Sequence, residues 1–134
     1  MKKMFFAVAI AAIANLFIGS CSNDTTLDLA LKVANRDMPM VVDEGITVEK
    51  VVDEDNYVVY ITTIDEDLYD MDELSEMQDL LKLTHKEELQ ALANDKDFKE
   101  FSSLCKKCNK GISYRYVGNQ SGITFSIDFE PYEF

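Results

Sequence analysis

The chain has 134 residues, with 25 acidic side chains against 13 lysines and arginines, so its net charge is −12 at neutral pH. Nucleic acid is therefore an unsuitable partner, because phosphate binding needs clustered lysine and arginine. The one local excess of cations, at Lys106, Lys107 and Lys110, falls near the predicted end of a helix, where cations complement the helix dipole.

The first segment of the chain has the pattern of an export signal. Lys2 and Lys3 precede an apolar run from Met4 to Ile18, which Asn15 interrupts. This run is too short for a membrane span, which needs about 20 apolar residues. A charged start, an apolar middle and an end of small residues are typical of a signal peptide. We expect residues 1–20 to be cleaved.

The residues around the expected cleavage site resemble the lipobox of bacterial lipoproteins. Ile18, Gly19, Ser20 and Cys21 supply its aliphatic residue, two small residues and cysteine. The resemblance implies a diacylglycerol on Cys21 and an acylated amino group, and two or three acyl chains anchor firmly because each buried methylene adds about 0.8 kcal/mol. In such lipoproteins, an aspartate directly after the cysteine favours retention at the inner membrane. This chain has Ser22 at that position, so we expect the outer membrane of the bacterial envelope. The alternative is a secretory signal with a chance cysteine.

The remaining chain is predicted to form one α+β domain. Loss of residues 1–20 removes two lysines and no acids, which takes the net charge from −12 to −14. We expect residues 21–25 to be the lipidated N-terminus and a short tether, and residues 26–134 to be the domain. Its length suits a single hydrophobic core.

A helix and a hairpin are predicted first. The apolar residues Leu27, Ala30, Leu31 and Ala34 recur at helical spacing, and Pro39 ends this helix. The following residues 40–42 are apolar and could be extended, and a turn at Gly45 leads into β-branched residues 46–52. A polar turn then precedes a second strand over residues 57–64, which completes the hairpin.

Residues 65–111 are predicted to be helical. Leu74, Met77 and Leu80 or Leu81 form an apolar stripe, and Thr84 with Glu87 resembles a capping box that would start a separate helix. The alternative is one continuous helix. A further helix is expected to start at Asn94 or Asp95 and to stop at Gly111.

The last segment carries a clear strand pattern. Apolar and polar residues alternate over residues 112–116 and again over 123–129, with Gly118 and Gly122 between them. We therefore predict a four-stranded antiparallel sheet of two hairpins, with helices packed on one face, in the order α-β-β-α-α-β-β. The other face should be polar, and either solvated or in contact with a partner; its predicted members are Ser113, Arg115, Thr124, Ser126 and Asp128.

Cys105 and Cys108 have the spacing of a redox pair or of half a zinc site. They fall near the end of the predicted helix, whereas reactive pairs are activated at a helix N-terminus. Their spacing from Phe98 and Phe101 places all four side chains on one face of the predicted helix, which we expect to face the core. We predict core thiols, with a structural disulfide in an oxidising envelope, or redox activity or metal binding, as alternatives.

An acidic run between residues 65 and 76 invites comparison with a calcium loop. The best candidate ligands are Asp65, Asp67, Asp70 and Glu76, but Tyr69 occupies a ligand position and Asp70 replaces the glycine that the loop needs. We therefore predict no metal site and no cofactor.

Catalysis has little support in the sequence. His85 is the only histidine, and the capping pattern at Thr84 predicts that it is an exposed first-turn residue. The chain has no glycine-rich phosphate loop and no G-x-S-x-G motif. We predict that the protein is not an enzyme.

A second resemblance covers about half of the domain. The segment from Asn35 to Tyr60, with Pro39, Gly45 and its strand from Tyr57, resembles a group of small, uncharacterised bacterial lipoproteins and secreted proteins. This resemblance implies a leading helix and a small sheet but no activity. Our main hypothesis is a membrane-anchored, noncatalytic interaction module with an envelope protein as partner. The alternatives are a lipoprotein that binds a small ligand or a divalent ion, and a thiol-dependent envelope enzyme.

Overall fold

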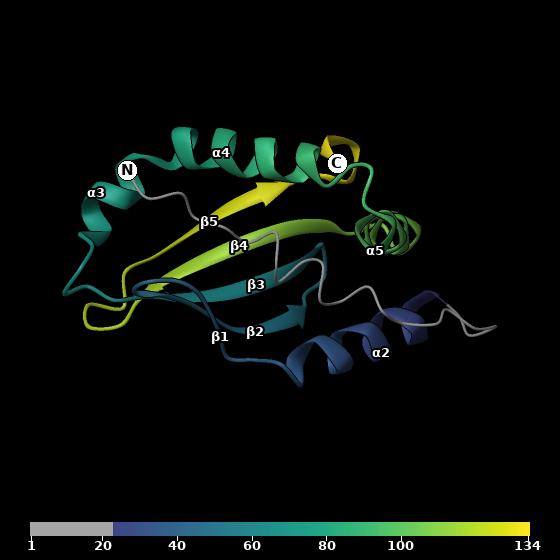
Figure 1. Cartoon of the computed structure of the whole chain (residues 1–134), viewed down its shortest axis with the longest axis horizontal. Coiled ribbons are helices and arrows are strands. Elements are labelled where there is room, and N and C mark those ends of the chain that lie inside the picture. The colour runs from purple at the N-terminus through teal and green to yellow at the C-terminus, as the bar shows by residue number, and fades with distance from the viewer. Residues whose placement is uncertain (1–22) are drawn as a thin grey trace.

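The computed structural model describes residues 23–134 and is shown in Figure 1. The predicted signal peptide and Cys21 lie outside the described residues. In the described part of the chain, no helix is both long and apolar enough to cross a membrane.

A five-stranded sheet forms the centre of the molecule, and its strands lie side by side in chain order. Three of the four pairings are antiparallel, and β3 and β4 run parallel. The strands are β1 (Met40–Asp43), β2 (Ile46–Asp53), β3 (Tyr57–Ile64), β4 (Gly111–Gly118) and β5 (Thr124–Phe129).

Within residues 23–134, four helices and a short 3-10 helix pack against this sheet. In Figure 1, α2 lies along the side of β2, α4 lies along β5, and α5 is seen end-on beyond the end of the strands. The elements are α2 (Asn23–Asn35), α3 (Met71–Glu76), α4 (Gln78–Ala91), α5 (Lys96–Lys107) and the 3-10 helix η1 (Pro131–Glu133). Residues 23–25, which belong to the expected tether of residues 21–25, are the first residues of α2.

The α+β class is confirmed, but the predicted four-stranded antiparallel sheet is wrong in two respects. First, Met40–Asp43 pairs with β2 as a fifth strand, through a tight turn in which Gly45 has φ = +77°. Second, residues 65–110 carry the chain back to the starting end of β3, so that β4 runs parallel to it. A parallel pair needs such a long crossover, which is usually helical.

The helical block also divides differently from the prediction. Met77 ends α3 and precedes α4, which then runs without a break through Thr84. The predicted capping box is therefore wrong, and the Thr84 hydroxyl instead donates to the Leu80 carbonyl oxygen at 3.0 Å. The start of α5 is confirmed, because the Asp95 carboxylate accepts from the Phe98 N–H at 2.9 Å.

One hydrophobic core joins all four helices to one face of the sheet. It contains apolar residues of α2, α3, α4 and α5 together with the alternate residues of β2, β3, β4 and β5 that include Tyr60, Tyr114 and Phe129. Val59, on the opposite side of β3, is buried but does not belong to this core. We call the sheet face opposite the helices the open face.

Candidate functional site

A row of small β-branched side chains crosses the open face. Each member pairs with the next across neighbouring strands, so that all five strands contribute one residue. The two end members are exposed and the three central ones are half-buried. We call this set the β-branched row; it consists of Val41, Thr47, Thr63, Val117 and Thr124.

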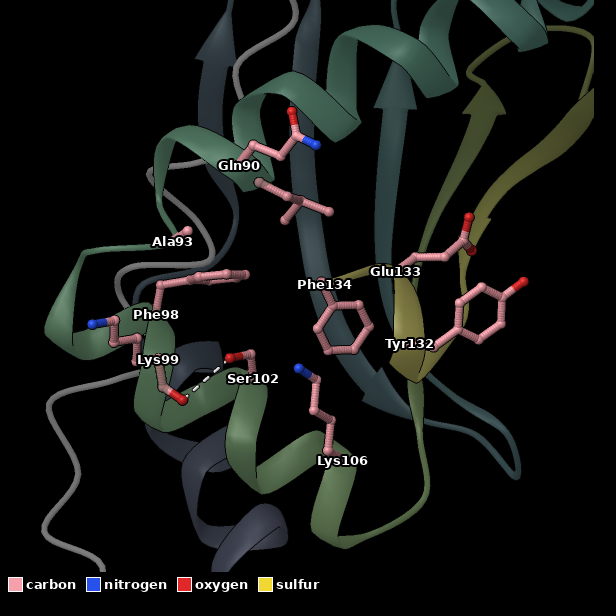
Figure 2. A pocket seen from close by; sticks show the side chains of 10 residues that line it. Gln90, Ala93, Phe98, Lys99, Ser102, Lys106, Tyr132, Glu133 and Phe134 are labelled. Atoms are coloured by element: carbon pink, nitrogen blue, oxygen red, sulfur yellow. Dashed lines mark hydrogen bonds between the residues drawn. The ribbon is translucent and has the colours of Figure 1, made fainter.

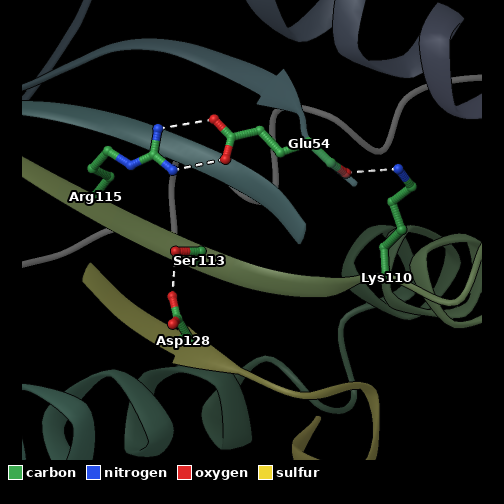
Figure 3. A network of polar contacts seen from close by, with 5 residues as sticks. All are labelled: Glu54, Lys110, Ser113, Arg115 and Asp128. Atoms are coloured by element: carbon green, nitrogen blue, oxygen red, sulfur yellow. Dashed lines mark hydrogen bonds and ion pairs between the residues drawn. The ribbon is translucent and has the colours of Figure 1, made fainter. Parts of the chain in front are cut away.

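An ion pair lies beside this row. The guanidinium of Arg115 on β4 donates two hydrogen bonds to the carboxylate of Glu54, at 2.7 and 2.9 Å (Figure 3). This bidentate contact lowers the pKa of Glu54, and the same hydrogen bonds raise the pKa of Arg115. Both side chains are partly exposed, so the pair adds about 0–1 kcal/mol to stability. Its main effect is to hold the turn between β2 and β3 over β4.

Two further contacts extend this polar network. The Ser113 hydroxyl donates to the Asp128 carboxylate at 2.6 Å, and the Lys110 ammonium donates to the Glu54 carbonyl oxygen at 2.8 Å (Figure 3). The Lys110 ammonium also contacts the Asp53 carboxylate. Ser113 is itself almost fully buried, although it lies on the open face. The members predicted for this face therefore lie on it on β4 and β5, whereas β1, β3 and β4 also contribute the apolar Val41, Val59 and Val117.

His85 is placed very differently from the prediction of an exposed first-turn residue. It is only 1% exposed, because α4 is continuous and presents this position to the sheet. Its Nε2 forms a hydrogen bond with the Tyr116 hydroxyl, and its ring stacks on Tyr114 with 4.6 Å between centroids. Its Nδ1 lies 3.6 Å from the Glu88 carboxylate. The only histidine is therefore part of a buried aromatic cluster.

The tyrosines of this cluster are enclosed by the core. Burial raises the pKa values of Tyr60, Tyr114 and Tyr116 well above the ordinary value. The Tyr60 hydroxyl and the Thr62 hydroxyl are buried, and neither has a hydrogen-bond partner within residues 23–134. The alternating sequence pattern predicted that these tyrosines face the core, but it gave no information on their hydrogen-bond partners.

Cys105 lies in the last turn of α5, and Cys108 follows directly after this helix. Cys105 is fully buried, as the core-thiol prediction expects, and Cys108 is half-buried against the same core. Burial raises the pKa of the Cys105 thiol far above its usual value. Because the thiolate is the nucleophile and the metal ligand, this environment opposes thiol chemistry at Cys105.

The four acidic candidate ligands do not converge on one point. The Asp65 carboxylate accepts from the Asp67 N–H, and Asp70 caps α3. Asp67 accepts from the Gln120 amide at 2.9 Å, and Glu76 is the last residue of α3. Among residues 23–134, no group of three or more histidine, cysteine or acidic side chains is arranged to hold a metal ion.

Glu66 is the acidic residue with the most defined role in this segment, and the sequence did not single it out. Its carboxylate accepts from the backbone N–H groups of Gln120 and Ser121 at 2.6 Å and from the Ser121 hydroxyl at 2.7 Å. The contacts with Ser121 lower the pKa of Glu66. Glu66 therefore ties the loop after β3 to the turn between β4 and β5.

A pocket of about 370 Å³ lies between α4, α5 and η1, on the helical side of the molecule (Figure 2). We call it the α4–α5 pocket. Its lining is mixed: Leu89, Ala93, Phe98 and Phe134 are apolar, and Lys99, Lys106 and Glu133 are charged. The sequence did not predict it, because its walls come from three separate elements.

Comparison with known proteins gives a likeness of fold. No protein-family model and no curated protein sequence matches the chain. The fold is similar to the crystal structure of a "putative secreted protein" from Pseudomonas aeruginosa, with a TM-score of 0.61. The alignment covers 86% of this chain and 98% of the other, at 11% sequence identity. At this identity the likeness concerns the fold alone.

Proposed function

We propose that this protein is a noncatalytic interaction module that is held at the bacterial envelope by lipid on Cys21 and binds a partner protein through the open face. The observation that carries this proposal is the β-branched row. It runs across all five strands on a sheet face that the described helices leave uncovered.

The physical properties of this row suit a protein contact. Valine and threonine have few χ1 rotamers, so little side-chain entropy is lost when a partner immobilises them. Val41, at one end of the row, is 71% exposed and offers apolar area to a partner. The ion pair between Glu54 and Arg115 holds the polar part of the same face in a fixed arrangement.

The positions of the reactive side chains favour a binding role over an enzyme. A histidine that exchanges protons with a substrate must reach it, but His85 lies in the core with its Nε2 bonded to Tyr116. The Cys105 thiol is buried and kept protonated by that burial. The thiol-dependent enzyme considered from the sequence therefore loses its main support.

The envelope location rests on the first part of the sequence and on the similar fold. Ile18, Gly19, Ser20 and Cys21 match the lipobox pattern, and Ser22 favours the outer membrane. The protein of similar fold carries the description "putative secreted protein". A large negative charge keeps such a domain from adhering to an anionic membrane surface.

The test is crosslinking in living cells, followed by affinity capture of the full chain and mass spectrometry. The double variant Val41→Glu/Thr124→Glu places a charge at each exposed end of the row. Its matched control, Leu29→Glu/Leu83→Glu, places the same two charges on exposed positions of α2 and α4. We expect the control to recover an envelope partner as the parent does. The face variant should recover about fivefold less, as a loss of about 1 kcal/mol implies.

Two results would overturn the proposal. One is equal recovery of the partner by the face variant and its control, which would place the contact elsewhere. The other is the absence of any enriched envelope protein with the parent chain.

A further inference from the structure

The α4–α5 pocket has the size of a small-molecule site, and its lining combines apolar and cationic side chains. At about 370 Å³ it falls within the usual range for small-molecule sites, which is about 300–1,000 Å³. Leu89 and Ala93 line it from α4 and the turn after it, Phe98 from α5, and Phe134 from the C-terminal segment. In Figure 2 the Phe98 and Phe134 rings point into the space between these elements.

Two lysines, Lys99 and Lys106, line this pocket, and neither forms an ion pair with a carboxylate within the described part of the chain. The Lys106 ammonium lies 5.4 Å from the centroid of the Phe134 ring, and Figure 2 shows it directed toward that ring.

The acidic residue that lines the pocket is committed to other contacts. One Glu133 carboxylate oxygen lies 3.3 Å from the Lys82 ammonium, and the other accepts from the Glu130 N–H at 2.8 Å. Figure 2 shows the Glu133 carboxylate directed away from Lys106. The positive charge of Lys106 therefore remains available to a ligand.

The C-terminal wall of the pocket is fixed before any ligand binds. Glu130 and Glu133 cap η1 reciprocally, and the Tyr57 hydroxyl donates to the Glu130 carboxylate at 2.7 Å. This hydrogen bond raises the pKa of Tyr57 to about 12, so the contact persists at neutral pH. A wall held in this way lowers the entropy lost on binding.

We infer that the α4–α5 pocket binds a single-chain fatty acid, with its carboxylate at Lys106 and its apolar chain against Leu89, Phe98 and Phe134. A carboxylate supplies the missing negative charge, and an alkyl chain suits walls of leucine and phenylalanine. The Ser102 hydroxyl lines the same pocket and donates to the Lys99 carbonyl oxygen at 3.2 Å. This site is separate from the open face and does not depend on the proposed partner.

Photolabelling of the full chain in phosphatidylcholine nanodiscs tests the inference. The probe is decanoic acid with a diazirine in its chain, and the comparison probe is the corresponding uncharged alcohol. We expect the acid to label peptides that contain residues 89–106 and 131–134, and an excess of unmodified decanoate to compete. The alcohol should label these peptides at least about fivefold less, because it lacks the charge that Lys106 recognises.

Two neighbouring lysines provide a matched pair of variants. Lys106 and Lys107 are both exposed in the last turn of α5, but only Lys106 lines the pocket. Lys106→Glu should lower labelling by the acid about fivefold or more, whereas Lys107→Glu should leave it unchanged. Ala93→Phe, at an exposed lining position, should reduce labelling by filling the space.

Equal effects of Lys106→Glu and Lys107→Glu, equal labelling by acid and alcohol, or labelling confined to other peptides would each overturn the fatty-acid site. The variant Val41→Glu/Thr124→Glu should label normally, so a failure here is distinguishable from a failure of the interaction proposal.

Discussion

Two buried tyrosines on adjacent strands meet different polar surroundings. The Tyr116 hydroxyl is bonded to His85 Nε2, whereas the Tyr60 hydroxyl has no hydrogen-bond partner among residues 23–134. Both side chains are fully buried in the same core. A buried hydroxyl that is bonded stabilises the fold, and one that is not bonded costs free energy.

Removal of each hydroxyl should therefore have a different effect on stability. Tyr116→Phe is expected to lower the free energy of unfolding by about 1–3 kcal/mol, because the His85 ring loses a buried bond. Tyr60→Phe should leave stability unchanged or slightly raised. Urea unfolding followed by circular dichroism measures both. A larger loss for Tyr60→Phe than for Tyr116→Phe would contradict this account of the cluster.

The burial of His85 could have been predicted only with the correct helix register. Thr84 and Glu87 have the spacing of a capping box, and that local pattern suggested a helix start. In the continuous helix α4, His85 instead lies one turn after Leu81 and one turn before Leu89, and all three are buried. Tertiary packing against the sheet therefore outweighed a local capping signal.

At the level of elements, the alternating patterns of β2, β3, β4 and β5 predicted their positions and their inward faces. The same patterns carried no information on which strands are neighbours. Alternation shows which side of a strand is buried, and it is the same for parallel and antiparallel pairing. The four-residue strand β1 was too short to give a pattern of its own.

Two glycines near the ends of β4 and β5 are required for different reasons. A Cβ on Gly111 would lie 2.2 Å from the Phe129 carbonyl oxygen, so the two strands could not approach as they do. Gly122 has open space around it, but its φ of +73° is strained for other residues.

We expect Gly111→Ala to be the more damaging substitution. Overpacking against a backbone atom costs about 1–3 kcal/mol or more, and a left-handed alanine at residue 122 costs about 1 kcal/mol. Thermal unfolding of the two variants provides the comparison. The opposite order of melting temperatures would show that the turn, rather than the strand contact, limits stability.

At the scale of the whole molecule, the two candidate binding surfaces lie on different elements. The open face draws its row from all five strands, and the α4–α5 pocket draws its walls from α4, α5 and the C-terminal segment. The sequence identified the polar members of the face on β4 and β5. It missed Val117, and it missed Val41, Thr47 and Thr63 because their place in one row with Thr124 depends on the β3–β4 pairing.

The anchoring proposal predicts where the whole chain is found in a cell. The full chain should fractionate with membranes and incorporate an alkyne-labelled palmitate supplied to the cells. Cys21→Ala should lose the label completely, because the thioether and the new amino terminus both depend on this cysteine. Label retained by Cys21→Ala would refute lipidation at this residue.

Because the parallel pair of β3 and β4 lies in the centre of the sheet, the sheet can be completed only after β4 has been synthesised. Tyr57–Ile64 pairs with Gly111–Gly118, so the middle of the sheet is completed by residues that are synthesised near the end of the chain. Until those residues arrive, β3 has an unpaired edge that offers its backbone groups to any extended chain nearby. The contacts that close the sheet are also distant in sequence, which slows folding. A nascent or truncated chain that ends before residue 111 is therefore prone to aggregate, although it contains three of the five strands.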